Sequence, residues 1–202
     1  IIWGTSSSWT LTALPLFVWM GEILFRTKLS ENLFEGLSPW MQKLPGGLIH
    51  VNVVGCALFA AISGSSAATV ATVGKMSIPE LRKRNYPEKI LLGSLAGSGT
   101  LGLLIPPSII LIIYGVTVQE SIAKLFVAGI IPGIMIALIF MGYVILWSLF
   151  NKEEMPNIVN QYSFIDKIKR SGQLIPVIIL ILSVIGSIYT GIATATEAAS
   201  LG

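Results

Sequence analysis

Charge is scarce in this sequence. Asp, Glu, Lys and Arg account for 11% of its 202 residues, whereas a soluble domain carries about 25%. Hydrophobic residues account for 53%, and the mean hydropathy is +0.81. Many of them lie in long runs such as 122–150, in which Lys124 is the single charged residue. Because apolar runs of more than about 18 residues are typical of membrane-spanning helices, the sequence predicts an all-α integral membrane protein.

Histidine and cysteine are also nearly absent. The sequence has one of each, His50 and Cys56, which excludes a disulfide framework, a histidine-based triad and a cluster of histidine metal ligands within it. The motifs H-E-x-x-H and G-x-S-x-G do not occur either, so we expect no enzyme activity and no bound cofactor. Cys56 lies in an apolar run and is expected to be a small core residue. His50 is expected to form structural hydrogen bonds.

The alternation of apolar and polar segments predicts several membrane helices. Apolar spans are expected at 9–25, 90–115, 122–150 and 173–190. Within 27–46, apolar residues recur at helical spacing among polar ones, which predicts an amphipathic helix lying in the membrane interface with Trp40 as its anchor. The amphipathic helix, together with two adjacent prolines inside the 90–115 span, makes this pattern different from a simple bundle of membrane-crossing helices.

The same alternation divides the chain into five parts. The first two parts are a membrane helix with the interfacial amphipathic helix (1–46) and a re-entrant helical hairpin (47–76). The third part (77–115) is a basic loop at 77–89 followed by a proline-broken membrane helix. The last two are a long membrane helix with a cytoplasmic loop (116–172) and a further membrane helix with the start of the second repeat (173–202). The chain begins without Met or a signal-peptide pattern and ends within TATEAASLG, so we expect a fragment.

Lys and Arg are concentrated in three of the connections. Segments 26–46, 75–89 and 151–172 hold three, five and four of them, whereas 116–124 holds only Lys124. Since positively charged loops stay on the cytoplasmic side, all three basic segments are expected there. The net charge of +3 therefore reflects topology, and no nucleic-acid partner is expected.

The shared side of the first two basic segments constrains the chain between them. That chain has to enter the membrane and return, which makes SGSS (63–66) the tip of a re-entrant hairpin. The alternative is a single crossing over 47–74, which would place Arg26, Lys28 and Lys43 outside. In the favoured scheme, segment 90–115 crosses the membrane and 122–150 crosses back.

Two helix breaks stand out in this apolar chain, SGSS at the hairpin tip and GSGTLGLLIPPS with its adjacent Pro106 and Pro107. Non-helical backbone at membrane depth is tolerated only inside protein or beside a water-filled cavity. Broken helices near the midplane are typical of transporter binding sites, where helix N-termini face anions and free carbonyls hold Na⁺. The alternative for the prolines is an ordinary kink in a packed bundle.

No charged side chain occurs in 51–74 or in 90–115. Proton relays within membranes normally use carboxylates or histidines, so a coupling ion bound near these breaks is expected to be Na⁺ on carbonyl and hydroxyl oxygens. The stretch GSGTLG (97–102) formally matches a dinucleotide-binding fingerprint, but it lies in an apolar span and lacks the preceding strand that the fingerprint requires.

Three further pairs have simple structural explanations. Glu22 and Arg26 are spaced to form an ion pair on one helix face. The glycine pairs Gly93/Gly97 and Gly129/Gly133 have the spacing that lets helices pack closely.

These segments resemble a known family. The run GGLIHVNVVGCALFAAISGSSAATVATVGKMSIPEL, followed by GSLAGSGTLGLLIPPSIILIIYG and LFVAGIIPGIM, is similar to the large membrane (DctM-type) subunit of tripartite ATP-independent periplasmic (TRAP) transporters. TATEAAS resembles the family's T-P-T-E-A-A segment, with Ala195 in place of the usual proline. The resemblance covers nearly the whole chain and is densest over 15–133.

The resemblance implies a multi-pass permease of a bacterial or archaeal cytoplasmic (inner) membrane, which imports organic acids such as C4-dicarboxylates or sialic acid with a Na⁺ gradient. It implies a small membrane subunit and a periplasmic substrate-binding protein as partners, besides the lipid bilayer. The implied fold is an elevator-type secondary transporter with two inverted repeats, of which this chain would hold most of the first and the opening of the second. A fragment of this kind is not expected to transport alone.

By the same resemblance, the ion and substrate site lies at the two breaks. The residues expected to bind Na⁺ or substrate are Ser63, Gly64, Ser65, Ser66, Gly97, Ser98, Gly99 and Thr100, and those expected to shape the helix break are Pro106, Pro107 and Ser108. Two other functions remain open from the sequence: a different Na⁺-coupled carboxylate transporter with the same hairpin architecture, and a channel or membrane scaffold.

Overall fold

The computed structural model describes residues 9–156 and 162–201, and within these ranges the regular structure is entirely helical. The elements are η1 (Trp9–Thr12), α2 (Ala13–Phe25), α3 (Leu29–Met41), α4 (Ile49–Ser63), α5 (Ser66–Lys83), α6 (Glu88–Gly99), η2 (Thr100–Leu103), α7 (Ile109–Val118), α8 (Ile122–Phe150), η3 (Lys152–Glu154), α9 (Phe164–Ser171), η4 (Gly172–Leu174), α10 (Ile175–Tyr189) and α11 (Ala195–Leu201).

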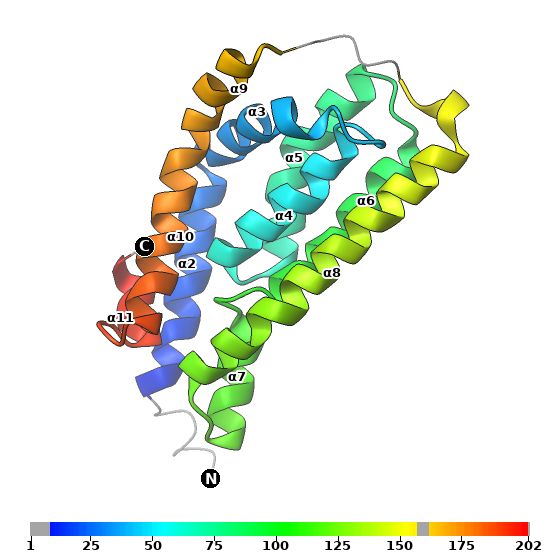
Figure 1. The fold of residues 1–202 in the computed structure, drawn as a ribbon. Helices are drawn as coiled ribbons and strands as arrows, with labels where there is room; N and C mark the ends of the chain where they lie inside the picture. Colours follow the sequence, from blue (N-terminus) through cyan, green and yellow to red (C-terminus); the bar gives the residue numbers. More distant parts are fainter. Residues whose placement is uncertain (1–8, 157–161, 202) are drawn as a thin grey trace.

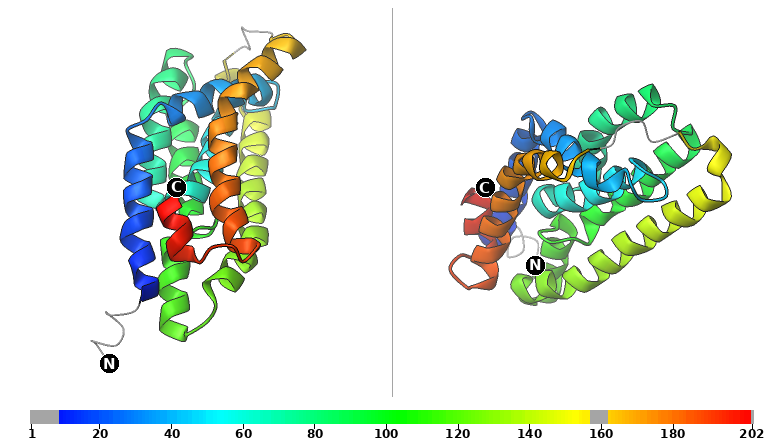
Figure 2. Two further views of the ribbon diagram at one scale, coloured as in Figure 1. Left: turned by 90° about the vertical axis from the view of Figure 1, so that its left-hand side faces the viewer. Right: turned by 45° about the horizontal axis from the view of Figure 1, so that its top comes forward.

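The helices run mostly lengthwise, with α3 lying across one end (Figures 1 and 2). The connections between α2 and α3, between α5 and α6, and after α8 all lie at that end, here called the basic end. The connections between α7 and α8 and between α10 and α11 lie at the opposite end. The three segments rich in Lys and Arg therefore gather at one end of the molecule, as the charge distribution predicts.

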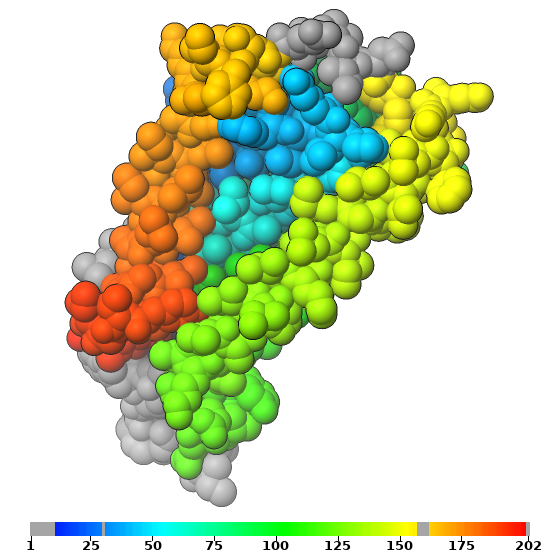
Figure 3. All heavy atoms as spheres, in the orientation of Figure 1, coloured from blue at the N-terminus to red at the C-terminus, as the bar shows by residue number. Residues whose placement is uncertain are grey.

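Helices α4 and α5 form a tight antiparallel hairpin, and α6 packs against both. Helix α4 begins at the basic end and has 15 residues, a length of about 22 Å, which is shorter than the roughly 30 Å of a bilayer's hydrocarbon core. It is almost wholly buried, with Ile49, Phe59 and Ala60 at 0% exposure. The neighbouring helices therefore cover most of α4, and Figure 3 shows α4 between α8 and α10.

Helix α5 continues to Lys83, so the predicted basic loop at 77–89 is wrong over its first half, and the hairpin extends beyond residue 76. Pro79 is exposed and interrupts the helix only on its outer side. Leu81 is fully buried in a cluster with Phe34 and Leu37 of α3. This packing holds the last turn of α5 helical although its sequence is polar.

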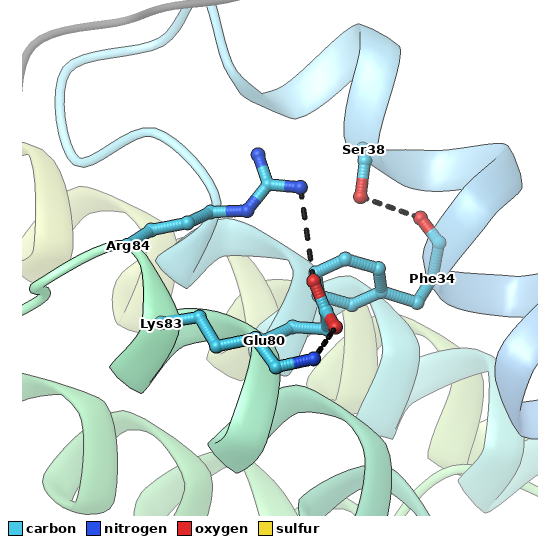
Figure 4. Close-up of polar contacts among 5 residues, drawn as sticks. All are labelled: Phe34, Ser38, Glu80, Lys83 and Arg84. Atoms are coloured by element: carbon cyan, nitrogen blue, oxygen red, sulfur yellow. Dashed lines mark hydrogen bonds and ion pairs between the residues drawn. The ribbon is translucent and has the colours of Figure 1, made fainter.

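The contact between α3 and the end of α5 carries a small charged group (Figure 4). Glu80 lies 3.1 Å from Lys83 Nζ and 3.8 Å from Arg84 on the next turn. Ser38 Oγ donates to the Phe34 carbonyl oxygen at 2.6 Å within α3. Such half-exposed ion pairs add little stability, so the apolar contacts beneath them account for most of the packing.

The predicted amphipathic segment at 27–46 is helical as α3, with Trp40 partly exposed at 42%. Trp40 Nε1 donates to Ser171 Oγ at 2.8 Å, and Lys167 Nζ lies 5.3 Å from the centroid of the Trp40 ring. Gln173 Nε2 donates to Glu35 Oε2 at 2.8 Å. Helix α3 is thus attached to α9, through Ser171, which lies 131 residues further along the chain than Trp40.

The predicted charged loop at 151–172 is also partly helical. Helix α9 begins at Phe164, where the Asp166 carboxylate accepts from the Ser163 N–H at 3.3 Å, and it continues through η4 into α10. This N-terminal cap and the apolar residues that follow it favour a helix over a loop. By length and composition, Ile122–Phe150 and Phe164–Tyr189 are each able to cross a membrane.

Tyr86 joins two connections at the basic end. Its hydroxyl oxygen accepts from the Leu48 N–H at 3.0 Å, just before α4 begins. Burial raises the pKa of Tyr86, although the Leu48 N–H and the charge of Arg84 partly lower it, so the phenol stays neutral at physiological pH. His50 Nε2 lies 2.7 Å from the Pro45 carbonyl oxygen, in agreement with its expected structural role.

The arrangement of the ends predicts a labelling pattern. Single cysteines replacing Lys28, Asn85 and Glu153 in the full-length protein should be shielded from a membrane-impermeant thiol reagent in intact cells, whereas one replacing Gln119 should react. All four positions are exposed, and the native Cys56 is fully buried and should not react. Permeabilised cells should label all four. Labelling at 28 with protection at 85 would contradict a hairpin that enters and leaves on one side.

Candidate functional site

The hairpin tip is a sharp reversal between α4 and α5. Gly64 ends α4 with a φ of +59°, in the left-handed region that favours glycine, and its N–H donates to the Ala60 carbonyl oxygen at 3.1 Å. Ser65 is extended and begins α5 as its N-cap, with Oγ accepting from the Ala68 N–H at 3.4 Å. The chain therefore turns back within two non-helical residues.

The tip is lined by hydroxyl groups. Ser63 Oγ lies 2.9 Å from Thr69 Oγ1, and the Thr69 hydroxyl donates to the Ser65 carbonyl oxygen at 2.8 Å. Because the Thr69 proton is used in that bond, Ser63 donates in the first one. Ser66 Oγ is buried and has no hydrogen-bond partner among the described residues. A buried hydroxyl without a protein partner is a suitable ligand for an ion or a water molecule.

The second break follows α6, where the chain passes through the 3-10 turn η2 and then leaves helical geometry. Pro106 and Pro107, joined by a cis peptide bond, have no N–H to donate. The carbonyl groups of Gly102 and Leu103 therefore lack the donors that a continuous α-helix would supply. The Ser108 hydroxyl supplies one of the missing donors, since it donates to the Leu103 carbonyl oxygen at 2.7 Å.

The two breaks lie against each other. The Ile109 N–H, at the start of α7, donates to the Gly64 carbonyl oxygen at 3.2 Å. A Cβ atom on Gly64 would lie 2.7 Å from the Pro107 carbonyl oxygen, and one on Gly102 would lie 2.8 Å from the Ser66 nitrogen. The main chains of the tip and of the proline break are thus in direct contact, and only glycine fits at these two positions.

Helix α8 supports the break from behind. A Cβ atom on Gly129 would lie 2.8 Å from the Leu104 carbonyl oxygen, and one on Gly133 would lie 2.8 Å from Ile105 Cγ1. The sequence predicts close packing at this glycine pair, and its partner is the non-helical segment just before the prolines. The break is therefore held between the hairpin tip on one side and α8 on the other.

Some of the residues expected at the site meet in the structure. Ser63, Gly64, Ser65 and Ser66 form the tip, and Gly99 packs directly against Val70 on the first turns of α5. Pro107 and Ser108 lie beside the tip, since the residue that follows them donates to Gly64. The structure therefore brings the hairpin tip and the proline break into direct contact.

Other expected residues lie elsewhere. Gly97 faces the Phe140 ring of α8, since a Cβ atom there would lie 3.2 Å from Phe140 Cε1. Thr100 is exposed, and its hydroxyl donates to the Gly97 carbonyl oxygen at 2.7 Å. Ser98 is fully buried between helices, and its hydroxyl donates to the Ser94 carbonyl oxygen at 2.6 Å.

Sequence reasoning missed two residues of this junction, Gly102 and Ile109. Gly102 is the third glycine of GSGTLG, and its spacing from Gly99 would have put both on one helix face. No pattern in the sequence marks Ile109, because its role depends on the free N–H of a helix start meeting a carbonyl group from another segment.

The junction is uncharged and rich in oxygen atoms. No Asp, Glu, Lys or Arg occurs in 51–74 or 90–115, and the described residues contain no group of three or more His, Cys, Asp or Glu side chains that could hold a metal ion. The ligands on offer are serine and threonine hydroxyls and main-chain carbonyls. Such a set suits a weakly bound monovalent cation such as Na⁺ rather than a transition metal.

The close contact at Gly102 predicts the effect of adding one methyl group. Gly102→Ala should push the tip away from the break and lower the free energy of unfolding by about 1–3 kcal/mol, since the neighbouring atoms are main chain and have little room to move. Gly93→Ala on α6 is the matched control, because nothing lies within 4 Å of its added Cβ, and it should leave stability unchanged or raise it. Thermal unfolding of the purified full-length protein measures both. Equal melting temperatures for the two variants would contradict the observed contact.

The sequence matches one protein family over almost its full length. The profile of the family described as "Tripartite ATP-independent periplasmic transporter, DctM component" matches residues 2–202. The C4-dicarboxylate TRAP transporter large permease protein DctM of Pseudomonas aeruginosa is 34% identical over 200 residues, which cover 99% of this chain and 46% of that protein.

Two further relatives carry the names of other substrates. The isethionate TRAP transporter permease protein DctMQ of Oleidesulfovibrio alaskensis is 36% identical over 205 residues, covering 100% of this chain and 31% of that protein. The sialic acid TRAP transporter permease protein SiaT of Haemophilus influenzae is 34% identical over 194 residues, covering 95% and 31%. The chain thus spans less than half the length of these three relatives. It belongs to the DctM family of tripartite ATP-independent periplasmic transporters, and the relatives that it matches are named as transporter permeases rather than enzymes.

Proposed function

We propose that this chain contributes the first half of the permease in a Na⁺-coupled TRAP transporter that imports organic acids. The observation that carries the proposal is the junction of the two helix breaks, where the Ile109 N–H meets the Gly64 carbonyl group and the Ser66 hydroxyl is buried with no partner in the described part of the chain. Paired helix breaks inside a membrane protein are typical of sites that bind and move ions or small solutes.

One Na⁺ ion is proposed to bind at the tip, on the face that the Ser66 hydroxyl occupies. The candidate ligands are hydroxyl and carbonyl oxygens of Ser63, Ser65 and Ser66, with the start of α5 contributing the positive end of a helix dipole toward an anionic substrate. Because 51–74 and 90–115 contain no charged side chain, the ion would supply a full positive charge to this junction. A carboxylate substrate would then bind more tightly when Na⁺ is present, which is the basis of coupling.

The substrate class and the partners are proposed from the relatives. Their names include a C4-dicarboxylate, isethionate and sialic acid, which are all organic anions. We propose an organic anion for this protein too, delivered by a periplasmic binding protein and carried with the help of a small membrane subunit. The permease would lie in the cytoplasmic membrane, with the basic end inside.

The movement is proposed to be of the elevator type. The hairpin, α6, η2 and α7 would move as one body, because the tip and the break share main-chain contacts. Helices α2 and α10 would belong to a static scaffold facing lipid, with exposed apolar residues such as Trp19 and Leu182. A second, inverted repeat would complete the site in the full-length protein.

Na⁺ coupling predicts how uptake responds to ion gradients. Uptake of radiolabelled succinate, isethionate or N-acetylneuraminate by the full-length permease with its small subunit and binding protein should require external Na⁺. It should persist when the proton gradient is collapsed while the Na⁺ gradient is kept, because segments 51–74 and 90–115 contain no carboxylate or histidine to carry a proton. Uptake that follows the pH gradient without Na⁺ would rule out this proposal.

The prolines offer a second test. The double substitution Pro106→Ala with Pro107→Ala restores two N–H donors and removes the steric block, so helical geometry should extend through the break. The carbonyls of the break would then bond within their own helix, and Ile109 would lose its position beside Gly64. Uptake should fall at least about tenfold, while membrane insertion and assembly with the small subunit stay normal.

Pro79→Ala on α5 is the matched control, because Pro79 lies inside a helix, is exposed, and is remote from the junction. It should leave uptake unchanged. Initial uptake rates, expression and subunit assembly are measured side by side for the parent and both variants. Near-normal uptake by the double variant would show that the prolines only kink a packed helix.

A further inference from the structure

Helices α4 and α6 run side by side in the same direction, from the basic end toward the junction (Figure 1). Helix α4 ends at the tip and α6 ends at the start of the break, so their axial register decides whether the two breaks meet. Many of the contacts between them are apolar; Val51 and Leu91, for example, belong to one buried cluster, and Val53 and Ile90 to another. Apolar contacts are non-directional and resist sliding only weakly.

Asn52 is a polar exception in this interface, and its side chain is 0% exposed. Its Nδ2 group donates to the Leu91 carbonyl oxygen at 3.2 Å and to Ser94 Oγ at 3.0 Å, both on α6. The Ser94 hydroxyl gives its own proton to the Leu91 carbonyl oxygen at 3.0 Å, so its oxygen is free to accept from Asn52. Both partners are acceptors here, which fixes which way the Asn52 amide faces.

Ser98, one turn after Ser94 on α6, contributes little to the attachment of α6 to α4. Ser98 Oγ lies 3.3 Å from the Asn52 carbonyl oxygen, but it has a shorter acceptor within its own helix, the Ser94 carbonyl oxygen at 2.6 Å. One hydroxyl proton serves one strong bond, so Ser98 adds little between the helices. The amide of Asn52 is the group that ties α4 to α6.

We propose that Asn52 is a positioning residue, which fixes the axial register of α6 against α4 and so holds the proline break against the hairpin tip. The inference rests on the proposed Na⁺ site at that junction. A slip of one residue moves a helix by about 1.5 Å, which is enough to break the 3.2 Å bond between Ile109 and Gly64. A buried amide sets register in helical coiled coils in the same way.

Asn52→Asp and Asn52→Leu test the proposal with little change of side-chain volume. Asn52→Asp keeps the shape of the side chain but places a carboxylate oxygen, which can only accept, against the Leu91 carbonyl oxygen and Ser94 Oγ. Asn52→Leu removes the polar group altogether. Ser77→Ala on α5 is the matched control, because the Ser77 hydroxyl is equally buried and has no partner among the described residues. Ser94→Ala completes a double-substitution cycle with Asn52→Leu.

The first measurement is amide hydrogen exchange of the purified full-length permease subunit. Peptides covering 100–110 should exchange faster in both Asn52 variants, with the Ile109 N–H included, whereas peptides from α8 and α10 should match the parent. Ser77→Ala should match the parent throughout. A uniform rise in exchange rate across all helices would overturn the proposal, because Asn52 would then be an ordinary packing residue. No change in the exchange rate at 100–110 would also overturn it, because Asn52 would then have no effect on the break.

The second measurement is the affinity for radioactive Na⁺ in the same preparations. Both Asn52 variants should raise the Kd for Na⁺ by about fivefold, the effect expected from losing one or two buried hydrogen bonds in a membrane protein. The pair Asn52→Leu with Ser94→Ala should be no weaker than Asn52→Leu alone. An unchanged Kd in the Asn52 variants would overturn the link to the ion site. Failure of the parent to bind Na⁺ would count against the proposed ion site itself, and exchange at 100–110 would still decide the role of Asn52.

Discussion

The need to pair every main-chain polar group away from water governs this structure. A helix that ends away from water leaves its last carbonyl groups without partners in its own helix, and both α4 and α6 end at buried residues, Ser63 and Gly99. The two ends are placed so that each helps the other: the Gly64 carbonyl oxygen of the tip accepts from the Ile109 N–H beyond the break. Either break alone would expose main-chain groups to an apolar environment, so the two breaks are parts of one feature.

Contact between two main chains requires that side chains be absent where they meet. Gly64 meets this requirement at the tip, Gly102 at the start of the proline break, and Gly129 on α8 behind the break. The junction is therefore close-packed while remaining polar, and its polar atoms are mainly oxygens of carbonyl and hydroxyl groups. The amide of Asn52 adds a directional contact to a bundle whose other contacts are mostly apolar.

Charge in this protein is separated from the junction along the molecule. Three sets of polar contacts lie at the basic end: the ion pairs of Glu80, the hydrogen bond from Trp40 to Ser171, and the hydrogen bond from the Leu48 N–H to the Tyr86 hydroxyl. These contacts attach α3 to α9 and the Tyr86 connection to the start of the hairpin, at the end of the molecule where the basic connections gather. The interior then depends on small polar groups alone, and each of them has a large effect in an apolar environment.

The sequence by itself determined the class of the protein, the helical hairpin with its tip at 63–66, the break at Pro106 and the gathering of the basic connections at one end, because hydropathy, proline chemistry and loop charge act locally. It misjudged the polar end of α5, where burial of Leu81 against α3 overrides a loop-like composition. Only the tertiary structure decided which face of α6 meets the tip. Helical faces differ by a rotation of about 100° per residue, so Ser98 and Gly99, although adjacent in sequence, point to different neighbours.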